Sequence, residues 1–329
     1  MILTRTPLRI TLGGGGTDLP FYADVHGGSL VTASINRYIY ITVSPRLQRN
    51  IKLNYSRTEI VEKAKDVRHP LIRECMKLTG TEAIEVHSTA EIPSGTGLGS
   101  SAAFTVGLLN GLYYHSGDIM SRYKLAEDAS HVIMDVLGEP CGKQDQYACA
   151  FGGINHLMVG TDGRVTVNPI DIHHEDILTL ERNLMIFYLG GERSASELLG
   201  QQRRKAKKPG ADIYDYYHKI KEIGEKSLKC LRRGDVTEFG RLMDDHWRLK
   251  REITDSMTNS RIDRLYSIAV KHKALGGKLI GAGGGGFLMV YAEKGRDRLL
   301  KVMESKGLTY TPFKFDFDGS RIVYDGAHY

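Results

Sequence analysis

A glycine-rich run at residues 91–104, EIPSGTGLGSSAAF, most constrains how this chain can fold. Residues 83–87 before it alternate apolar and polar side chains as a strand does, and the apolar residues that follow it recur at helical spacing. Glycines at positions 95, 97 and 99 carry no Cβ atom, so they can adopt positive φ and turn successive N–H groups toward one anion. The run therefore predicts a strand, a phosphate-binding loop and a helix N-terminus.

Two other glycine loops that bind nucleotides do not fit this run. A Walker loop requires G-x-x-x-x-G-K-[ST], and no lysine follows Gly99. A dinucleotide fingerprint requires G-x-G-x-x-G at the first βαβ unit, whereas this run reads G-x-G-x-G and follows about ninety residues of chain. A P-loop NTPase is excluded at this site and a Rossmann oxidoreductase is disfavoured. A flexible turn capped by serine stays open as the simplest alternative.

The cysteines and the hydropathy pattern indicate a cytoplasmic protein. The four cysteines, at positions 75, 141, 149 and 230, form neither a C-x-x-C motif nor a zinc-like spacing, so free thiols in a reducing compartment are expected. Residues 1–7 lack the apolar core of a signal peptide. The longest nearly uncharged run, residues 279–292, is too short and too rich in glycine to span a bilayer.

The formal net charge of +6 is compatible with several anionic partners. The densest basic cluster, Arg203 to Lys208, contains no aromatic residues of the kind that bind single-stranded nucleic acid. A solvated loop or lid is the favoured interpretation of this cluster, followed by contact with an anionic substrate. We expect neither a nucleic-acid partner nor a membrane partner, and the sequence leaves the oligomeric state open, a homodimer included.

Strand patterns dominate the first ninety residues, and helical patterns dominate the last third. Strands are predicted at residues 3–12, 29–33, 38–44, 83–87, 151–158, 184–189 and 288–292. Helices are predicted after the glycine run and at residues 121–137, 213–231, 236–253 and 262–273. Polar residues at 138–147 interrupt the pattern between a helix and a strand. Near residues 175–185 a new strand begins and the hydrophobic pattern then becomes mainly helical, which predicts a domain boundary there.

Two further glycine stretches flank the first one in the chain. Residues 7–18 read PLRITLGGGGTD, and residues 276–287 read GGKLIGAGGGGF. Together with residues 93–103, PSGTGLGSSAA, these stretches resemble in type and order the three signature motifs of the GHMP sugar kinases. The resemblance extends over nearly the whole chain, and residues 142–147 and 246–251 resemble the heptose phosphate kinases of that superfamily. Fucokinases share part of the first motif.

The resemblance implies an α+β fold of two domains, with the active site in the cleft between them. The N-terminal domain is expected at residues 1–180, with the ATP cradle and the catalytic base. The C-terminal domain is expected at residues 181–329, with mainly helical structure and the third glycine motif.

The resemblance also implies the catalytic residues. A sugar hydroxyl is a weak nucleophile at neutral pH, so a carboxylate within hydrogen-bond distance can accept its proton as the bond to phosphorus forms. Asp145 matches the position of this base. Arg9 matches a position from which a guanidinium can offset charge on the transferred group. A solvated loop aspartate and an outward-facing strand arginine are the simpler alternatives.

The binding residues are carried over from the same motifs. Those expected to bind ATP are Pro93, Ser94, Gly95, Thr96, Gly97, Leu98, Gly99, Ser100, Ser101 and Ala102. Those expected to bind the acceptor are Gly15, Gly16, Thr17, Asp18, Lys143, Gln146, Gly283 and Gly284, with Lys278 as a further candidate for an anionic group. Gly15 and Gly16 replace a Glu-His pair of the galactokinase type, which leaves room for a seven-carbon sugar.

The magnesium site departs from the pattern of the family. Many GHMP kinases pair the second cradle serine, here Ser101, with a glutamate three helical turns before the base. The matching position is Ile133, which cannot bind a hard cation, and Asp135 is displaced by about 200° around an ideal helix. Either the helix is distorted, or Mg²⁺ is held by ATP phosphates, Ser101 and water. We favour the second interpretation.

The activity that the resemblance implies is ATP-dependent phosphoryl transfer to the anomeric hydroxyl of D-glycero-D-manno-heptose 7-phosphate, for nucleotide-activated heptose synthesis. A hexose 1-kinase of the fucose or galactose type is the alternative enzyme. A regulator that binds ATP and sugar without turnover is the alternative outside catalysis, and the intact Arg9 and Asp145 argue against it.

Overall fold

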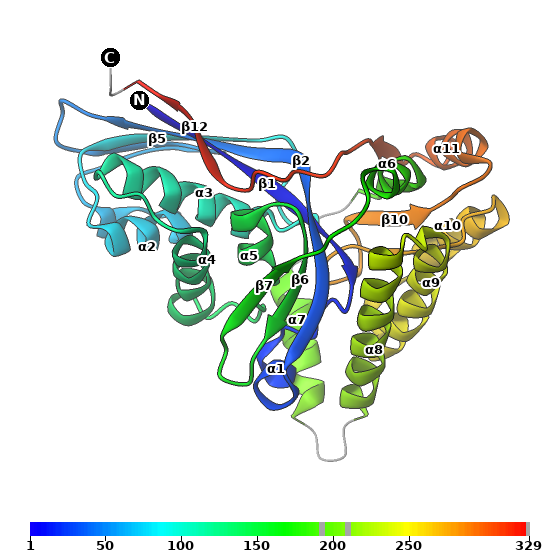
Figure 1. The fold of residues 1–329 in the computed structure, drawn as a ribbon. Helices are drawn as coiled ribbons and strands as arrows, with labels where there is room; N and C mark the ends of the chain where they lie inside the picture. Colours follow the sequence, from blue (N-terminus) through cyan, green and yellow to red (C-terminus); the bar gives the residue numbers. More distant parts are fainter. Residues whose placement is uncertain (191–194, 208–211, 327–329) are drawn as a thin grey trace.

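The computed structural model describes residues 1–190, 195–207 and 212–326, and within them two β-sheets carry packed helices (Figure 1). The larger sheet has the order β12-β1-β2-β5-β3-β4, with β6 paired to β2 and to β7. Its strands are β1 (Ile2–Gly13), β2 (Gly28–Pro45), β3 (Ile51–Asn54), β4 (Thr58–Val61), β5 (Ile84–Ala90), β6 (Ile154–Val159), β7 (Val165–Pro169) and β12 (Arg321–Asp325). The smaller sheet has the order β11-β8-β10-β9, from β8 (Leu184–Tyr188), β9 (Gly276–Leu279), β10 (Phe287–Tyr291) and β11 (Thr309–Thr311). The predicted α+β class is confirmed.

The long antiparallel pair of β1 and β2 forms the centre of the larger sheet (Figure 1). The sequence predicted two separate strands in place of β2, and this prediction was wrong. Pro7 pairs with Tyr38 and Leu8 pairs with Ile35, so residues 36–37 form a bulge inside one continuous strand. Beyond the smaller sheet the chain returns to the larger one, because β12 pairs with β1. The domain division at residues 180 and 181 stays a prediction.

Helix α3 (Ser100–His115) packs under β1 and β2 and is buried along most of its length. Two glycines allow this close approach: a Cβ atom at Gly107 would come 2.6 Å from Thr6 Oγ1, and one at Gly111 would come 3.0 Å from Val43 Cγ2. Helices α2 (Pro70–Thr79), α4 (Arg122–Ser130) and α5 (Gln144–Phe151) contact α3. The other helical elements in this half of the chain are α1 (Pro20–His26), a 3₁₀ turn (Ala64–Asp66) and a π-helical segment (His131–Val136). Helix α5 was not predicted from the sequence.

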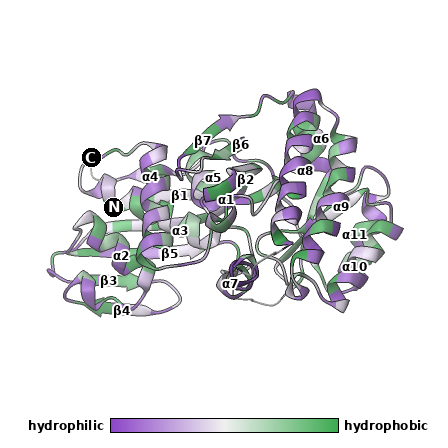
Figure 2. Ribbon diagram, turned by 90° about the horizontal axis from the view of Figure 1, so that it is seen from below, coloured by the Kyte–Doolittle hydropathy of each residue, from purple (hydrophilic) through white to green (hydrophobic). Residues whose placement is uncertain are grey.

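The helices of the last third agree with prediction to within two residues at each end: α8 (Ile213–Arg233), α9 (Val236–Ile253) and α10 (Ser260–Lys271). Gly234 ends α8 with a φ of 72°, and the Asp235 carboxylate caps α9 by accepting a hydrogen bond from Glu238 N. Figure 2 shows hydrophobic and hydrophilic residues interleaved along these helices, as expected for amphipathic packing. The other elements are α6 (His174–Asn183), α7 (Ala195–Ala206), a 3₁₀ turn (Asp255–Met257) and α11 (Arg296–Ser305).

Two further predictions concern the surface of the molecule. Within the described ranges, no helix is both long and apolar enough to cross a membrane. The basic cluster lies at the end of α7, where Lys205 forms an ion pair of 3.2 Å with Asp212, while Lys208 lies outside the described residues. The role of this cluster stays a prediction.

Candidate active site

A cavity of about 500 Å³ lies where the three glycine motifs meet. Its wall includes the end of β1, the start of α3, the start of α5 and the end of α9. Arg9 and Ala282 both line this cavity, so segments far apart in the sequence form one site.

The predicted phosphate cradle, residues 93–102, forms one end of this cavity. Gly95, Gly97 and Gly99 adopt φ values of 73°, 87° and 77°, which side chains other than glycine rarely tolerate. Gly99 precedes α3, and no side chain of the described residues caps the helix there, so the first N–H groups of α3 are open to a ligand. This arrangement fits an anionic phosphate group at the positive end of the helix.

The structure separates the ten predicted cradle residues into two groups. Those that line the cavity are Gly95, Gly97, Gly99, Ser100, Ser101 and Ala102. The other four lie outside the cavity wall. The Thr96 hydroxyl donates to the carbonyl oxygen of Pro93 at 2.9 Å, Leu98 is fully buried, and Ser94 is exposed.

The third glycine motif packs directly on the cradle. A Cβ atom at Gly97 would lie 2.7 Å from the carbonyl oxygen of Ile280, and one at Gly281 would lie 2.6 Å from Cα of Gly97. Close approach of two backbones therefore explains these glycines. Gly283 and Gly284, predicted to bind the acceptor, instead contact Met257: Gly284 N donates to its carbonyl oxygen at 2.9 Å. Neither of these two residues lines the cavity.

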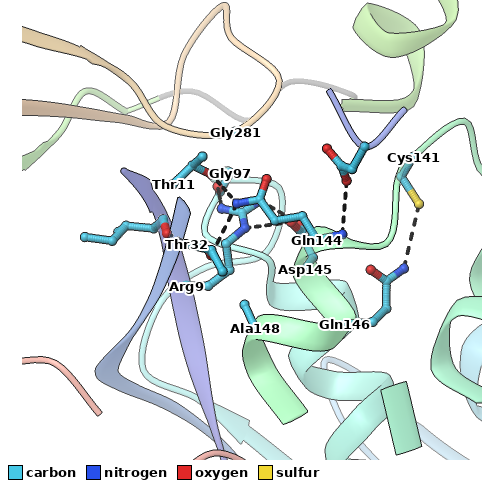
Figure 3. A network of polar contacts seen from close by, with 12 residues as sticks. Arg9, Thr11, Thr32, Gly97, Cys141, Gln144, Asp145, Gln146, Ala148 and Gly281 are labelled. Atoms are coloured by element: carbon cyan, nitrogen blue, oxygen red, sulfur yellow. Dashed lines mark hydrogen bonds and ion pairs between the residues drawn. The ribbon is translucent and has the colours of Figure 1, made fainter. Parts of the chain in front are cut away.

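Arg9 and Asp145 form a two-pronged ion pair at the centre of the site (Figure 3). Arg9 Nε lies 2.6 Å from Asp145 Oδ1, and Arg9 Nη2 lies 2.7 Å from Oδ2. The third nitrogen, Nη1, donates to the carbonyl oxygen of Gly97 at 2.6 Å. The Arg9 side chain is 6% exposed, whereas that of Asp145 is 32% exposed, so the carboxylate is open to the cavity. The pair links the predicted base to the cradle.

Asp18, in the loop after β1, lines the cavity together with Arg9 and Asp145. Its Oδ2 accepts a hydrogen bond of 3.0 Å from Gln144 N, at the start of α5. Burial, followed by the charge of Asp145, raises the pKa of Asp18 above its ordinary value. Gly142 has no room for a side chain, since a Cβ atom there would lie 2.6 Å from the carbonyl oxygen of Asp18. Gly15 and Gly16 line the cavity next to Asp18.

Two residues predicted to bind the acceptor are held elsewhere. Thr17 is fully buried, and its hydroxyl donates to the carbonyl oxygens of Gly14 and Ser29 at 2.8 and 3.0 Å. Lys143 donates to both carboxylate oxygens of Glu127 at 2.9 Å, and neither Thr17 nor Lys143 lines the cavity. By contrast, Gln146 lines the cavity beside Cys141 (Figure 3).

The helix before the base is distorted into a π-helical segment, and the next carboxylate along the chain, Glu139, lines the cavity. Ile133 and Asp135 lie in the π-helical segment, where Ile133 lines the cavity. The Asp135 side chain is 70% exposed and pairs with His131 Nδ1 at 3.0 Å, outside the cavity wall. Within the described ranges, no group of three or more His, Cys, Asp and Glu side chains is arranged to hold a metal. Ser101 lines the cavity at the start of α3, and its role as a ligand of Mg²⁺, together with phosphate oxygens and water, stays a prediction.

Sequence reasoning did not assign roles to several cavity residues from α8 and α9. Tyr217 donates to Gln202 Oε1 at 2.5 Å, and His246 and Lys250 line the cavity near Lys278. Lys278 is 2% exposed and donates to the carbonyl oxygen of Leu12 at 3.1 Å. The signal that points to His246 and Lys250 is the resemblance of residues 246–251 to the heptose phosphate kinases, and the two are four residues apart on one face of α9.

Comparison with known proteins identifies the family. The GHMP kinases N terminal domain matches residues 52–153 and the GHMP kinases C terminal domain matches residues 227–307, together more than half of the chain. The chain is 28% identical to D-glycero-alpha-D-manno-heptose 7-phosphate kinase of Campylobacter jejuni, with 97% of each protein covered. It is 22% identical to the bifunctional fucokinase/GDP-fucose pyrophosphorylase of Arabidopsis thaliana, over 87% of this chain and 29% of that longer protein.

A solved structure has the same fold. The D-glycero-D-manno-heptose 1-phosphate kinase from Bacteroides thetaiotaomicron superposes with a TM-score of 0.81 and 23% identity, over 99% of this chain and 100% of the other. The order of the two matched domains, the glycine cradle and the full-length similarity lead to one conclusion. The chain belongs to the GHMP kinase family and is an ATP-dependent kinase.

Proposed function

We propose that this kinase transfers the γ-phosphoryl group of ATP to the anomeric hydroxyl of D-glycero-D-manno-heptose 7-phosphate. The ion pair of Arg9 and Asp145 beside the cradle carries the proposal, because it supplies a carboxylate base where an acceptor hydroxyl can meet a bound phosphate. The similarity to a heptose 7-phosphate kinase over 97% of the chain supports the choice of acceptor.

The residues of the site would act together on the acceptor oxygen. Asp145 accepts the hydroxyl proton while that oxygen forms a bond to the γ-phosphorus and the bond from phosphorus to the β-phosphate oxygen breaks, releasing ADP. Each carboxylate oxygen of Asp145 can accept more than one hydrogen bond, so its pairing with Arg9 leaves a lone pair for the acceptor. The cradle and the α3 N-terminus stabilise the phosphate charges.

The acceptor would lie between the loop after β1 and the start of α5. Asp18 has one carboxylate oxygen committed to Gln144 N, and the other can accept sugar hydroxyl hydrogens. Gly15 and Gly16 provide open wall beside it. Thr17 and Lys143 would support this region indirectly, since their contacts lie outside the cavity. Gly283 and Gly284 would act through Met257, which lines the cavity.

An acceptor panel tests the proposal. ADP release is measured with heptose 7-phosphate, heptose, fucose, galactose and mannose. Phosphorylated heptose as the sole good acceptor supports the proposal. Fucose as the better acceptor would favour a fucokinase, which the similarity to the Arabidopsis protein makes the second candidate. Tight binding of ATP and sugar without turnover of any acceptor would favour a sensing regulator.

The Asp18→Ala variant tests whether Asp18 binds the sugar. We expect KM for the sugar to rise by about ten- to hundredfold, the scale of a lost hydrogen bond to a charged group, while KM for ATP changes little. Steady-state kinetics with each substrate varied separately measure both constants. Equal increases in the two values would mean that Asp18 only maintains the local structure through Gln144.

Magnesium dependence should distinguish Ser101 from Asp135. In the Ser101→Ala variant we expect the Mg²⁺ concentration for half-maximal rate to rise at least roughly tenfold, the scale of losses when groups that hold a metal are removed. Asp135→Asn is the control, because that side chain is exposed and pairs with His131. A magnesium titration at saturating ATP, with folding checked by circular dichroism, measures both. A large rise for Asp135→Asn would contradict the expected metal site.

The cellular setting proposed for the reaction is the cytoplasm. All four cysteines are free thiols, and Cys75 and Cys149 are buried. Such thiols persist in a reducing compartment, where ATP and sugar phosphates are also found. The proposal requires no nucleic-acid or membrane partner.

A further inference from the structure

Lys250, near the end of α9, brings a positive charge to the cavity that the mechanism above does not use. Its ammonium donates to the carbonyl oxygen of Gly281 at 2.5 Å. Within residues 1–190, 195–207 and 212–326, it forms no ion pair with a carboxylate, whereas Arg9 is paired with Asp145. A cation in a cavity wall without a counter-ion is positioned to bind an anion supplied by a ligand.

A chain of contacts connects Lys250 to the ion pair of Arg9 and Asp145. Gly281, which accepts its hydrogen bond, packs against Gly97 of the cradle. Gly97 in turn accepts a hydrogen bond of 2.6 Å from Arg9, which holds Asp145. Figure 3 shows Gly281 above Gly97 and Arg9 in the same part of the site. Lys250 and Arg9 therefore approach the cradle from the C-terminal and N-terminal parts of the chain.

The surroundings of Lys250 are electropositive. Burial, and then the charge of Arg9, lowers its pKa to about 8. Lys278 lies on β9 in the same wall, and His246 one turn earlier on α9 has a pKa well below its usual value because of burial and these two lysines. His246 Nε2 is buried and has no hydrogen-bond partner in the described part of the chain. An anion would relieve the repulsion between these groups and favour protonated Lys250.

We propose that Lys250 is a catalytic residue that binds the oxygens of the transferred γ-phosphoryl group, opposite Arg9. The proposal rests on the phosphoryl transfer proposed above and adds to it the group that neutralises the third phosphate. The base at Asp145 must reach the acceptor oxygen, so the γ-phosphorus must lie close to Arg9 and to the loops joined at Gly97 and Gly281. The distal phosphate of a heptose phosphate, at the far end of the sugar, would lie away from this point.

Nucleotide binding without any sugar tests the proposal independently of the acceptor. Calorimetry compares ADP with the non-hydrolysable ATP analogue AMP-PNP in the wild type, Lys250→Met and Lys250→Arg. For Lys250→Met we expect AMP-PNP affinity to fall about tenfold or more, as for loss of a charge-assisted hydrogen bond, while ADP affinity changes little. The kcat should fall by roughly a hundred- to thousandfold, the scale for removal of one group that stabilises developing charge. Lys250→Arg should recover most of the AMP-PNP affinity.

Lys221→Met is the matched control. Among the described residues, Lys221 also donates only to backbone carbonyl oxygens, those of His26 and Gly27, and it does not line the cavity. Its variant should keep the wild-type ratio of AMP-PNP to ADP affinity. An unchanged ratio of AMP-PNP to ADP affinity in Lys250→Met would overturn the proposal. A variant that loses affinity for the sugar phosphate but keeps its affinity for AMP-PNP would overturn it too. Lys250→Gln gives the same test if the methionine variant does not fold. A failed acceptor panel would refute the proposed acceptor and leave this ratio unaffected.

Discussion

Asp145→Asn is expected to lower kcat by roughly a hundred- to ten-thousandfold, the usual contribution of a general base. Asparagine keeps the shape of the side chain and one acceptor oxygen for Arg9, but it cannot accept the hydroxyl proton. ATP affinity should change little, because Arg9 Nη1 still bonds to Gly97 and the cradle does not depend on the carboxylate. Steady-state kinetics and nucleotide binding by calorimetry measure the two effects separately.

Asp128→Asn is a suitable control for this variant. Asp128 is a buried carboxylate that pairs with Lys124 at 2.6 Å and accepts a hydrogen bond from Tyr113 at 2.7 Å, outside the cavity. Its replacement should lower the temperature of unfolding without lowering kcat. Near-normal turnover by Asp145→Asn, or an equal loss of turnover in the Asp128 variant, would refute the role of Asp145 as the base.

The parts of the fold that follow from local chemistry were predictable from the sequence. Helices α8 and α9 carry regular apolar spacing and are separated by Gly234 and the capping residue Asp235, so their ends were predicted closely. The cradle was predictable because three glycines in five residues require an unusual backbone. In both cases the determining interactions lie within a few residues of one another.

The parts that depend on distant contacts were not predictable from local patterns. Helix α5 begins with polar residues at a predicted break, and its first turn is fixed by the bond from Gln144 N to Asp18. Lys143, beside the base in sequence, pairs with Glu127 rather than facing the cavity. The single strand β2 was not predictable for the same reason, because its residues on both sides of the bulge at 36–37 pair with the distant strand β1.

The two glycine loops depend on each other structurally. A run of glycines such as that of the third motif allows close approach of the backbone either to a ligand or to an opposing loop. At Gly281 and Gly286 the neighbour is the opposing loop, since side chains there would collide with Gly97 and Thr96. The cradle is thus held between α3 and the third motif. A change in either loop should therefore alter phosphate binding.

The largest effect on ATP binding is expected from Gly97→Val. Gly97 has a φ of 87°, and a Cβ atom there would lie 2.7 Å from the carbonyl oxygen of Ile280. A branched side chain would strain this backbone and push the two loops apart. The N–H groups of the cradle would no longer converge on the phosphates, so ATP affinity should fall at least roughly a hundredfold, as expected when several charge-assisted hydrogen bonds are lost.

Gly117→Val separates this effect from backbone strain alone. Gly117 has nearly the same φ, 90°, but within the described part of the chain nothing lies within 4 Å of a Cβ atom built there. Both variants should lose stability through the positive φ, which costs roughly 1–2 kcal/mol for a residue other than glycine. Only Gly97→Val should also lose ATP affinity, measured by calorimetry on protein whose circular dichroism spectrum is native. Gly97→Ala, with a smaller side chain, provides the same comparison if the valine variant does not fold. Unchanged ATP affinity in a folded Gly97 variant would mean that phosphate does not bind at this loop.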